Sequence, residues 1–397
     1  MPIDLEHFDF DQIIPRTATA SEKWDGRLAK FGSADVAPLW VADMDFAVPT
    51  AVSDALLARA RHPIYGYTLA EDGVYDSLIT WLYQQHGWHV KREWIVLMPG
   101  VVPSIYAAVQ ALTLPTQGVI VQPPVYPPFV SAVTTHQRTV FANPLVLENG
   151  HYKMDLAQLE TIAQQGAKLL LLCSPHNPVG RVWLRDELAG VLDIVRRYQL
   201  IVFSDEIHAD LIYPQFKHIP LATLADAGDT VITAVAPSKT FNLAGLGLSA
   251  LIIPNAHIRQ QMADAFAQLH ITALNPFSLT AWTAAYQHGG AWRDALMVYV
   301  ADTCDAVMAY CAQHLPVIRP IKPEGTYLMW LDCRALAMSD TALQDFFIRQ
   351  CGVGLNAGVS FGQGGSGYMR INLASPRAQV MAALAQVRLG WLSLDHA

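Results

Sequence analysis

The sequence is poor in charged residues, since 26 Lys and Arg and 34 Asp and Glu make up only 15% of its 397 residues. An ordinary globular chain carries roughly 25%. Hydrophobic residues reach 52%, which excludes an intrinsically disordered protein, because disorder requires few apolar groups and high charge. The net charge is −8 and no run of Lys or Arg is present, so we expect no nucleic-acid partner.

The longest stretch without a formal charge lies between Glu93 and Arg138, and its length alone would allow it to span a bilayer. Seven prolines interrupt it, and each removes a backbone donor that a spanning helix needs. The stretch therefore predicts buried strands, turns and a helix of a large core. The first residues have no basic segment followed by an apolar one, so we expect no signal peptide, and we expect no membrane among the partners.

Cysteine is also scarce, with five residues, an odd number, and no CxxC pair. This pattern excludes a disulfide framework and a cysteine zinc site, and it predicts free thiols in a reducing cytoplasm. Internal repeats, low-complexity tracts and Ser/Gly-rich linkers are absent as well. The length predicts two or three domains, which must pack closely against each other.

Short apolar runs alternate with helical patterns through the middle of the chain. A continuous apolar run predicts a strand that is buried on both faces, and its alternation with helices predicts an α/β sheet. The helical pattern is clearest over 185–198, where Leu188, Val191, Leu192 and Val195 recur at helical spacing. The predicted strands are 118–122, 168–173, 200–204, 230–235 and 248–253.

Ligands of such sheets bind beyond the carboxyl ends of the strands, and polar residues follow two of these strands directly. Asn177 lies in a rigid Ser-Pro-His-Asn-Pro-Val-Gly turn after the first of them. Asp205 ends the second, with His208 three residues later. An ordinary Asn-Pro turn and a helix-capping Asp are the structural alternatives. A metal site using Asp205, Glu206, His208 and Asp210 is a further alternative, but it lacks HExxH-type spacing.

Lys239 is the only formally charged residue between Thr230 and Ile258. Burial destabilises an ammonium group and lowers its pKa, and the neutral amine is the nucleophile that forms a Schiff base with an aldehyde. Alternatively, the side chain reaches solvent from a buried segment. The preceding Ala-Pro-Ser turn and the glycines at 245 and 247 favour a site.

Together these residues suit pyridoxal 5′-phosphate (PLP), which needs a lysine and an acidic partner for its ring nitrogen. Asp205 would keep that nitrogen protonated, and Asn177 would donate to the phenolic oxygen of the ring. The loop at Gly100 and Val101 opens a predicted helix, whose first N–H groups suit a phosphate. Tyr126 follows a predicted strand and could stack on the ring.

The order Asn177, Asp205, Lys239, Arg370 resembles the fold-type I PLP enzymes of aminotransferase class I/II. Within them the chain is most similar to the MalY/PatB group of cystathionine β-lyases (C–S lyases), over essentially its whole length. The segments that carry the resemblance are FDQIIPR (10–16), KWD (23–25), WVADMDF (40–46), YGY (65–67), CSPHNPVG (173–180), SDEIH (204–208), SKTFN (238–242) and MRIN (369–372).

The resemblance implies a large domain, 46–285, with a mixed, mostly parallel seven-stranded sheet. A smaller α+β domain would combine residues 1–45 and 286–397. It also implies a homodimer with shared active sites, in which Tyr67, with Tyr65 as the alternative, reaches the phosphate of the neighbouring subunit.

For the site, the resemblance implies that Lys239 holds PLP, with Asp205, Asn177, His208 and Tyr126 around the ring. His208 stands where many aminotransferases have a tyrosine. The remaining implied contacts are Gly100, Val101 and Ser238 with the phosphate, Arg370 with the substrate α-carboxylate, and Trp40 and Val41 with the rest of the substrate. Many members of the superfamily carry a phosphate-binding arginine eight residues after the lysine, whereas this chain has Gly247.

The activity that the resemblance implies is β-elimination from cystathionine or related cysteine S-conjugates, giving a thiol, pyruvate and ammonia. Lys239 would act as the base that removes the Cα proton. An aminotransferase would use the same residues and is the nearest alternative. A regulatory protein that retains PLP is a further alternative.

Overall fold

The computed structural model describes residues 8–272 and 274–394. Its central element is a mixed seven-stranded sheet in the order β2-β10-β9-β8-β7-β3-β4, in which β10 alone runs antiparallel to its neighbours. The predicted sheet is thereby confirmed. Its strands are β2 Ile95–Met98, β3 Gly118–Val121, β4 Thr139–Ala142, β7 Ala167–Cys173, β8 Ile201–Asp205, β9 Thr230–Val235 and β10 Ser249–Ile252.

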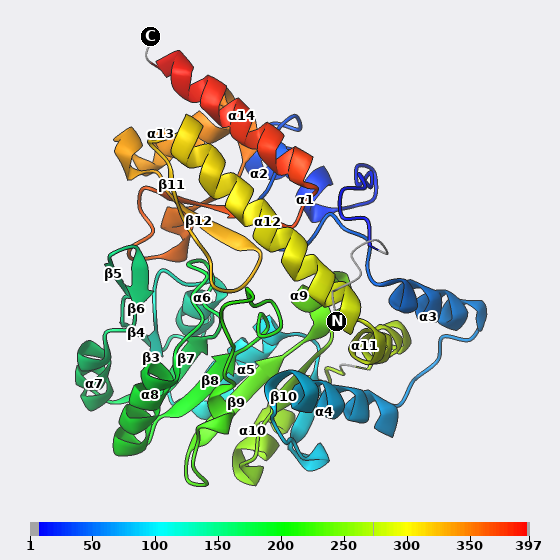
Figure 1. Cartoon of the computed structure of the whole chain (residues 1–397). Helices are drawn as coiled ribbons and strands as arrows, with labels where there is room; N and C mark the ends of the chain where they lie inside the picture. Colours follow the sequence, from blue (N-terminus) through cyan, green and yellow to red (C-terminus); the bar gives the residue numbers. More distant parts are fainter. Residues whose placement is uncertain (1–7, 273, 395–397) are drawn as a thin grey trace.

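Helices cover both faces of this sheet, which explains why its strands read as continuous apolar runs (Figure 1). Alternate strand residues face opposite ways. Leu169 and Leu171 of β7 pack with helices α5, α6 and α10, whereas Leu170 and Leu172 pack with α7 and α8. The bounds of these helices are α5 Val101–Leu112, α6 Pro128–Thr135, α7 Leu156–Gln164, α8 Arg185–Tyr198 and α10 Ala256–Ala267.

A second, four-stranded sheet has the order β11-β12-β15-β14 and is antiparallel throughout. Its strands are β11 Arg319–Ile321, β12 Leu328–Asp332, β14 Asn356–Ala357 and β15 Tyr368–Asn372. The N-terminal part joins the C-terminal part through the parallel pair β1 Ala37–Pro38 and β13 Val353–Gly354. A hairpin of β5 Val146–Glu148 and β6 His151–Lys153 completes the strands of the described residues.

The remaining helices flank these sheets. The long α12 lies beside α14 in Figure 1, and the two are in contact. By length and composition α12 could cross a membrane. Trp292, Leu296 and Val300 of α12 are buried in the main hydrophobic cluster, however, so packing within the fold accounts for its apolar character. These helices are α1 Glu22–Asp25, α2 Arg27–Phe31, α3 Thr50–Arg61, α4 Asp72–His86, α9 Pro237–Thr240, α11 Pro276–His288, α12 Gly290–His314, α13 Asp340–Asp345 and α14 Arg377–Leu394.

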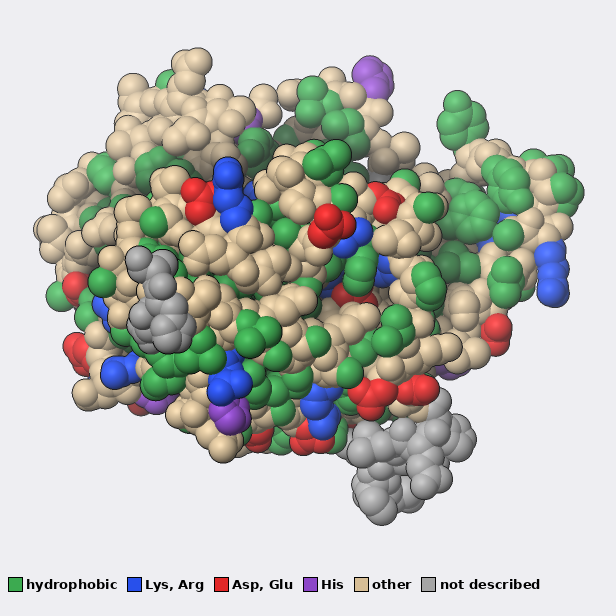
Figure 2. Space-filling model, turned by 90° about the horizontal axis from the view of Figure 1, so that it is seen from above, with side chains coloured by type: hydrophobic (Ala, Val, Ile, Leu, Met, Phe, Trp, Pro, Cys, Tyr) green, Lys and Arg blue, Asp and Glu red, His purple; other side chains and the backbone are tan. Residues whose placement is uncertain are grey.

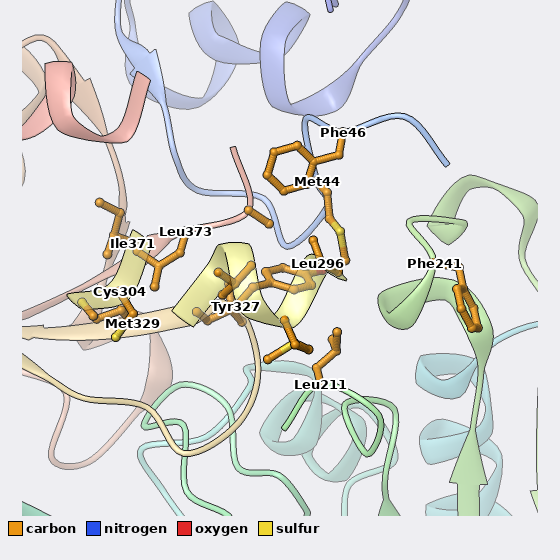
Figure 3. Close-up of a cluster of buried hydrophobic side chains, with 14 of the residues drawn as sticks. Met44, Phe46, Leu211, Phe241, Leu296, Cys304, Tyr327, Met329, Ile371 and Leu373 are labelled. Atoms are coloured by element: carbon orange, nitrogen blue, oxygen red, sulfur yellow. The ribbon is translucent and has the colours of Figure 1, made fainter. Parts of the chain in front are cut away.

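The main hydrophobic cluster joins segments that are distant in the sequence (Figure 3). Met44 and Phe46 from the N-terminal part lie near Leu296 of α12 and Tyr327 beside β12, and Phe241 after α9 belongs to the same cluster. The residues on either side of Met44 are thereby fixed against both sheets. The division into domains 46–285 and 1–45 with 286–397 stays a prediction, and its later boundary falls inside α11.

A projection formed by α3 and the chain that follows it stands out from the body (Figure 1). Figure 2 shows hydrophobic side chains gathered on it at the right. Between α3 and α4, Ile64, Tyr65, Tyr67 and Leu69 are all more than half exposed. An exposed apolar segment of this kind is typical of an interaction surface.

Candidate active site

The register of the sheet brings the predicted strand ends together. Asp205, the last residue of β8, pairs with Cys173, which ends β7, and with Ala234 of β9. Parallel strands end at the same sheet edge, so the segments that carry Asn177, His208 and Lys239 emerge side by side. The polar residues predicted from strand ends therefore lie in one place.

A cavity of about 670 Å³ opens at this edge, a size typical of small-molecule sites. Every predicted site residue except Tyr67 lines it: Trp40, Val41, Gly100, Val101, Tyr126, Asn177, Asp205, His208, Ser238, Lys239 and Arg370. The N-terminal part, the large sheet and the C-terminal sheet each contribute to the lining.

Lys239 lies in the short helix α9, which Pro237 begins. Its Nζ donates a hydrogen bond of 2.6 Å to the carbonyl oxygen of Ala42. Burial, with the nearby Arg370 cation, lowers the pKa of Lys239 to about 8. A substantial fraction of the amine is therefore neutral just above physiological pH, as a nucleophile or a base requires.

Asp205 is a buried carboxylate with little compensation for its charge. It accepts a hydrogen bond of 3.1 Å from the Ile207 amide, and the described residues supply no side-chain donor to it. Burial raises the pKa of Asp205 to about 7. A cationic N–H group in the cavity, such as a pyridinium, would restore the ionised form.

Arg370 enters the cavity from the central strand β15. Its two terminal nitrogens donate to Asn177 Oδ1 at 2.9 Å and to the Trp40 carbonyl at 3.0 Å. Its buried Nε has no partner among residues 8–272 and 274–394. Burial lowers the pKa of Arg370 to about 10, so the guanidinium stays charged at neutral pH and is suited to a carboxylate. Since Asn177 accepts through Oδ1, its amide nitrogen is left to donate to a ligand.

His208 and Tyr126 border the same space. Burial lowers the pKa of His208 to about 3, and Lys239 and Arg370 contribute to the shift. The imidazole is therefore neutral, and its buried Nδ1 has no partner in the described part of the chain. Burial raises the pKa of the Tyr126 phenol, so Tyr126 is protonated and presents a neutral ring to the cavity.

Gly100 and Val101 lie where α5 begins, and Ser238 lines the same cavity. The first N–H groups of a helix have no partner within it and suit a phosphate. Gly247 lines the same region and has a left-handed backbone, with φ of 54°. No lysine or arginine other than Lys239 and Arg370 lines the cavity within the described chain, so the described residues supply no cation at the phosphate end besides Lys239.

Tyr67 is fully exposed and does not line this cavity. Tyr65, the predicted alternative, instead donates to the Ala60 carbonyl. A role for Tyr67 thus requires a second subunit, as the prediction states, and it stays a prediction.

Sequence reasoning missed the side chains that hold the segment 40–46. Asn372 donates to the carbonyls of Val41 and Asp43 at 2.7 and 2.6 Å, and Asn356 donates to that of Trp40 at 2.6 Å. Asn242 binds the backbone of Met44 and Phe46. Asn242 and Asn372 belong to the SKTFN and MRIN segments, so a signal existed for them, but Asn356 stands in no such segment.

The metal alternative at Asp205, Glu206, His208 and Asp210 is not favoured, because these side chains point to different partners. Glu206 accepts from Ser204 and pairs with His218, whereas Asp210 pairs with His86. In the chain as described, no three His, Cys, Asp or Glu residues gather closely enough to hold an ion.

A larger hollow, of about 910 Å³, lies at the opposite end of the strands, next to Ile201 and Thr230, where β8 and β9 begin. Its charged groups are engaged, since Arg196 pairs with Asp229 and Arg138 donates to the Thr113 carbonyl. It therefore offers no comparable chemistry.

The cavity fits PLP in its donor set: a buried amine, a buried acid without a side-chain donor, an amide NH₂ and a helix start for the phosphate. The family model "Aminotransferase class I and II" matches residues 35–387. The chain belongs to this family. Cystathionine beta-lyase PatB of Bacillus subtilis is 40% identical over 96% of this chain and 99% of that protein. Protein MalY of Escherichia coli is 32% identical over 95% of this chain and 97% of its own length. The crystal structure of cystalysin from Treponema denticola, described as containing a pyridoxal 5′-phosphate cofactor, superposes with a TM-score of 0.94 at 35% identity, covering 98% of this chain and 99% of that one.

Proposed function

We propose that the protein is a PLP-dependent carbon–sulfur β-lyase that acts on cystathionine or related L-cysteine S-conjugates. The observation that carries the proposal is that Lys239, Asp205 and Arg370 line one cavity. It is supported by the similarity to PatB, which is named a cystathionine beta-lyase and aligns with nearly the whole chain. The reaction adds one water and breaks the Cβ–S bond: a cysteine conjugate gives a thiol, pyruvate and ammonia.

PLP supplies, when bound, an aldehyde that links covalently to an amine and a ring that accepts the electron pair left at Cα. Asp205 is a buried residue of the cavity lining, and its carboxylate would keep a proton on the ring nitrogen. Asn177 would donate from its amide nitrogen to the phenolic oxygen, and Tyr126 and His208 would border the ring. Gly100, Val101 and Ser238 would bind the phosphate, as set out above.

The remaining groups would bind and deprotonate the substrate. Arg370 would take the α-carboxylate, since its guanidinium is already oriented by Asn177 and Trp40. The amine of Lys239, with its lowered pKa, would remove the Cα proton, and the electron pair of the Cβ–S bond would leave with the thiolate. Trp40 and Val41 would contact the remainder of the substrate.

The test is to incubate the purified protein and PLP with cystathionine and to measure pyruvate, free thiol and ammonia. We expect the three products in equal amounts from the natural sequence and none from Lys239→Ala. Amino transfer to 2-oxoglutarate without pyruvate would instead identify an aminotransferase and overturn the proposal.

We further propose that the protein acts as a homodimer in which Tyr67 of each subunit donates to the phosphate in the other. Two observations support this: the apolar side chains exposed between α3 and α4, and the cavity lining, to which the residues that the structure describes contribute no cation at the phosphate end besides Lys239. Light scattering on the purified protein tests it, and a monomer with full activity would refute it.

We also infer a cytoplasmic location, which is supported by the five cysteines, all buried and unpaired. In the proposed division into domains, the cavity would lie between a large domain, 46–285, and a small domain made of 1–45 and 286–397.

A further inference from the structure

The mouth of the cavity carries one acidic side chain that the proposed reaction does not use. Three carboxylates line the cavity: Glu22, Asp43 and Asp205. Asp205 is the buried acid, and Asp43 is paired with Arg16 at 2.6 Å. Glu22 is exposed, and its carboxylate has no hydrogen bond or ion pair to any described residue.

The backbone at Glu22 is held firmly, although its side chain is free. The next residue, Lys23, is fully buried and pairs with Asp45 at 2.6 Å. Trp24 Nε1 donates to the same carboxylate at 2.9 Å, and Trp40 Nε1 donates to the Lys23 carbonyl at 3.1 Å. These bonds tie α1 to the segment that bears Trp40, so the backbone of Glu22 is held at the cavity that Glu22 and Trp40 both line.

Charge is distributed unevenly along the cavity. Its two lining cations, Lys239 and Arg370, are both assigned to the reacting part of the substrate. Asn356 near the mouth is neutral, and its amide is used by the Trp40 carbonyl. The part of a substrate that extends past Arg370 towards solvent therefore meets a carboxylate and no compensating cation from the described residues.

We propose that Glu22 is a specificity-determining residue, which favours cysteine conjugates whose leaving thiol carries an ammonium group and disfavours those whose leaving thiol ends in a carboxylate alone. In cystathionine, the distal ammonium would be its partner. The proposal rests on the proposed lyase function.

Three conjugates of similar length isolate the charge of the leaving group: S-(2-aminoethyl)-L-cysteine, S-propyl-L-cysteine and S-(2-carboxyethyl)-L-cysteine. For each, kcat/KM for pyruvate release is measured with the natural enzyme, Glu22→Gln and Glu22→Lys. An exposed ion pair is worth about 0.2–1 kcal/mol, so the ratio of aminoethyl to propyl conjugate should fall roughly 1.4- to fivefold in Glu22→Gln. In Glu22→Lys the preference should move further, towards the carboxyethyl conjugate.

Glu93→Gln is the matched control, because Glu93 is exposed in the short helix η2 Arg92–Trp94 and lies outside the cavity lining. Glu93→Gln removes the same charge and should leave the aminoethyl-to-propyl ratio of kcat/KM equal to that of the natural enzyme. The effect of Glu22→Gln should also shrink in high salt, which screens exposed charges.

A binding measurement keeps the two proposals separate. Calorimetric titration of the aminoethyl and propyl conjugates into Lys239→Ala, with and without Glu22→Gln, tests Glu22 without turnover. An aminoethyl-to-propyl ratio that is the same in the natural enzyme and Glu22→Gln, in both turnover and binding, would overturn the role of Glu22. Absence of pyruvate from all three conjugates with the natural enzyme would overturn the lyase proposal instead, and the titration would still decide the role of Glu22.

Discussion

We expect Asp205→Asn to stabilise the cofactor-free protein, although it removes a group that the proposed reaction needs. Burial raises the pKa of Asp205 from 3.8 to about 7, so the ionised carboxylate is unfavourable in the folded state. Asparagine keeps an acceptor for the Ile207 amide and carries no charge. A shift of about 3 pKa units corresponds to roughly 4 kcal/mol, a value that already includes the partial offset of the charge by Lys239.

The sign and the pH window follow from linkage. The folded protein holds the Asp205 proton more tightly than the unfolded chain, so its stability falls as pH rises between about 4 and 7. Only well below pH 3.8 are both states protonated, and there the difference between the two proteins vanishes. Above pH 7 the full difference applies.

Thermal unfolding of the cofactor-free proteins at pH 4.5 and pH 8 measures this. An unfolding entropy of roughly 2.1 cal/mol/K per residue gives about 0.8 kcal/mol/K for a chain of this length, so 4 kcal/mol raises Tm by about 5 °C at pH 8. At pH 4.5 about 1 kcal/mol of the difference remains, so the rise should shrink to about 1 °C, and with PLP bound the natural protein should gain more stability than Asp205→Asn. Asp54→Asn, an exposed change on α3, is the control. A lower Tm for Asp205→Asn at pH 8, or the same rise at both pH values, would refute the reasoning.

Further predictions concern other groups of the site and the turn that holds it. Arg370→Lys should lower kcat/KM by roughly tenfold or more, because a charged hydrogen bond is worth about 1.5–3 kcal/mol, whereas unaltered kinetics would remove Arg370 from substrate binding. Competitive acetylation of the cofactor-free protein should titrate Lys239 with a midpoint near its pKa of about 8, and a midpoint near 10.5 would contradict its burial. Tyr67→Phe should raise the dissociation constant for PLP roughly tenfold while the protein stays dimeric, and unchanged affinity would exclude the phosphate contact. Gly180→Ala should destabilise the fold by about 1–3 kcal/mol, since Gly180 has φ of 73° and a Cβ there would lie 2.6 Å from Pro323 Cβ; an unchanged Tm would contradict this.

The sequence was most informative where local rules decide the structure. Apolar runs predicted the strands, with small errors at the ends: β8 spans Ile201–Asp205, whereas residues 200–204 were predicted. Because parallel strands end at one sheet edge, Asn177 and Asp205 could be placed together without knowledge of the tertiary packing. The isolated charge of Lys239 was likewise a signal that could be read directly.

The sequence was least informative where contacts join distant segments without regular structure. Residues 40–46 have no helical or strand periodicity, and their position depends on side chains such as Asn356 and Tyr327 that lie about 300 residues later. Glu22 was missed for the same reason, since its place at the cavity depends on the buried pairing of Lys23 with Asp45. Nothing in the immediate neighbourhood of these residues predicts such contacts.

The backbone at 40–46 also connects the two proposed functions of the cavity, substrate binding and proton removal. The Trp40 carbonyl accepts from Arg370, and the Ala42 carbonyl, two residues later, accepts from Lys239 and from the hydroxyl of Tyr327. Buried carbonyls must be hydrogen-bonded, so this irregular segment is held in place by the same side chains that it positions. The distance between Arg370, which would bind the carboxylate, and the Lys239 amine, which would act on Cα, is thus set by one short stretch of backbone. A change that loosens the stretch should alter turnover without touching either side chain, because Arg370 and Lys239 would both lose the backbone carbonyl that accepts their hydrogen bond.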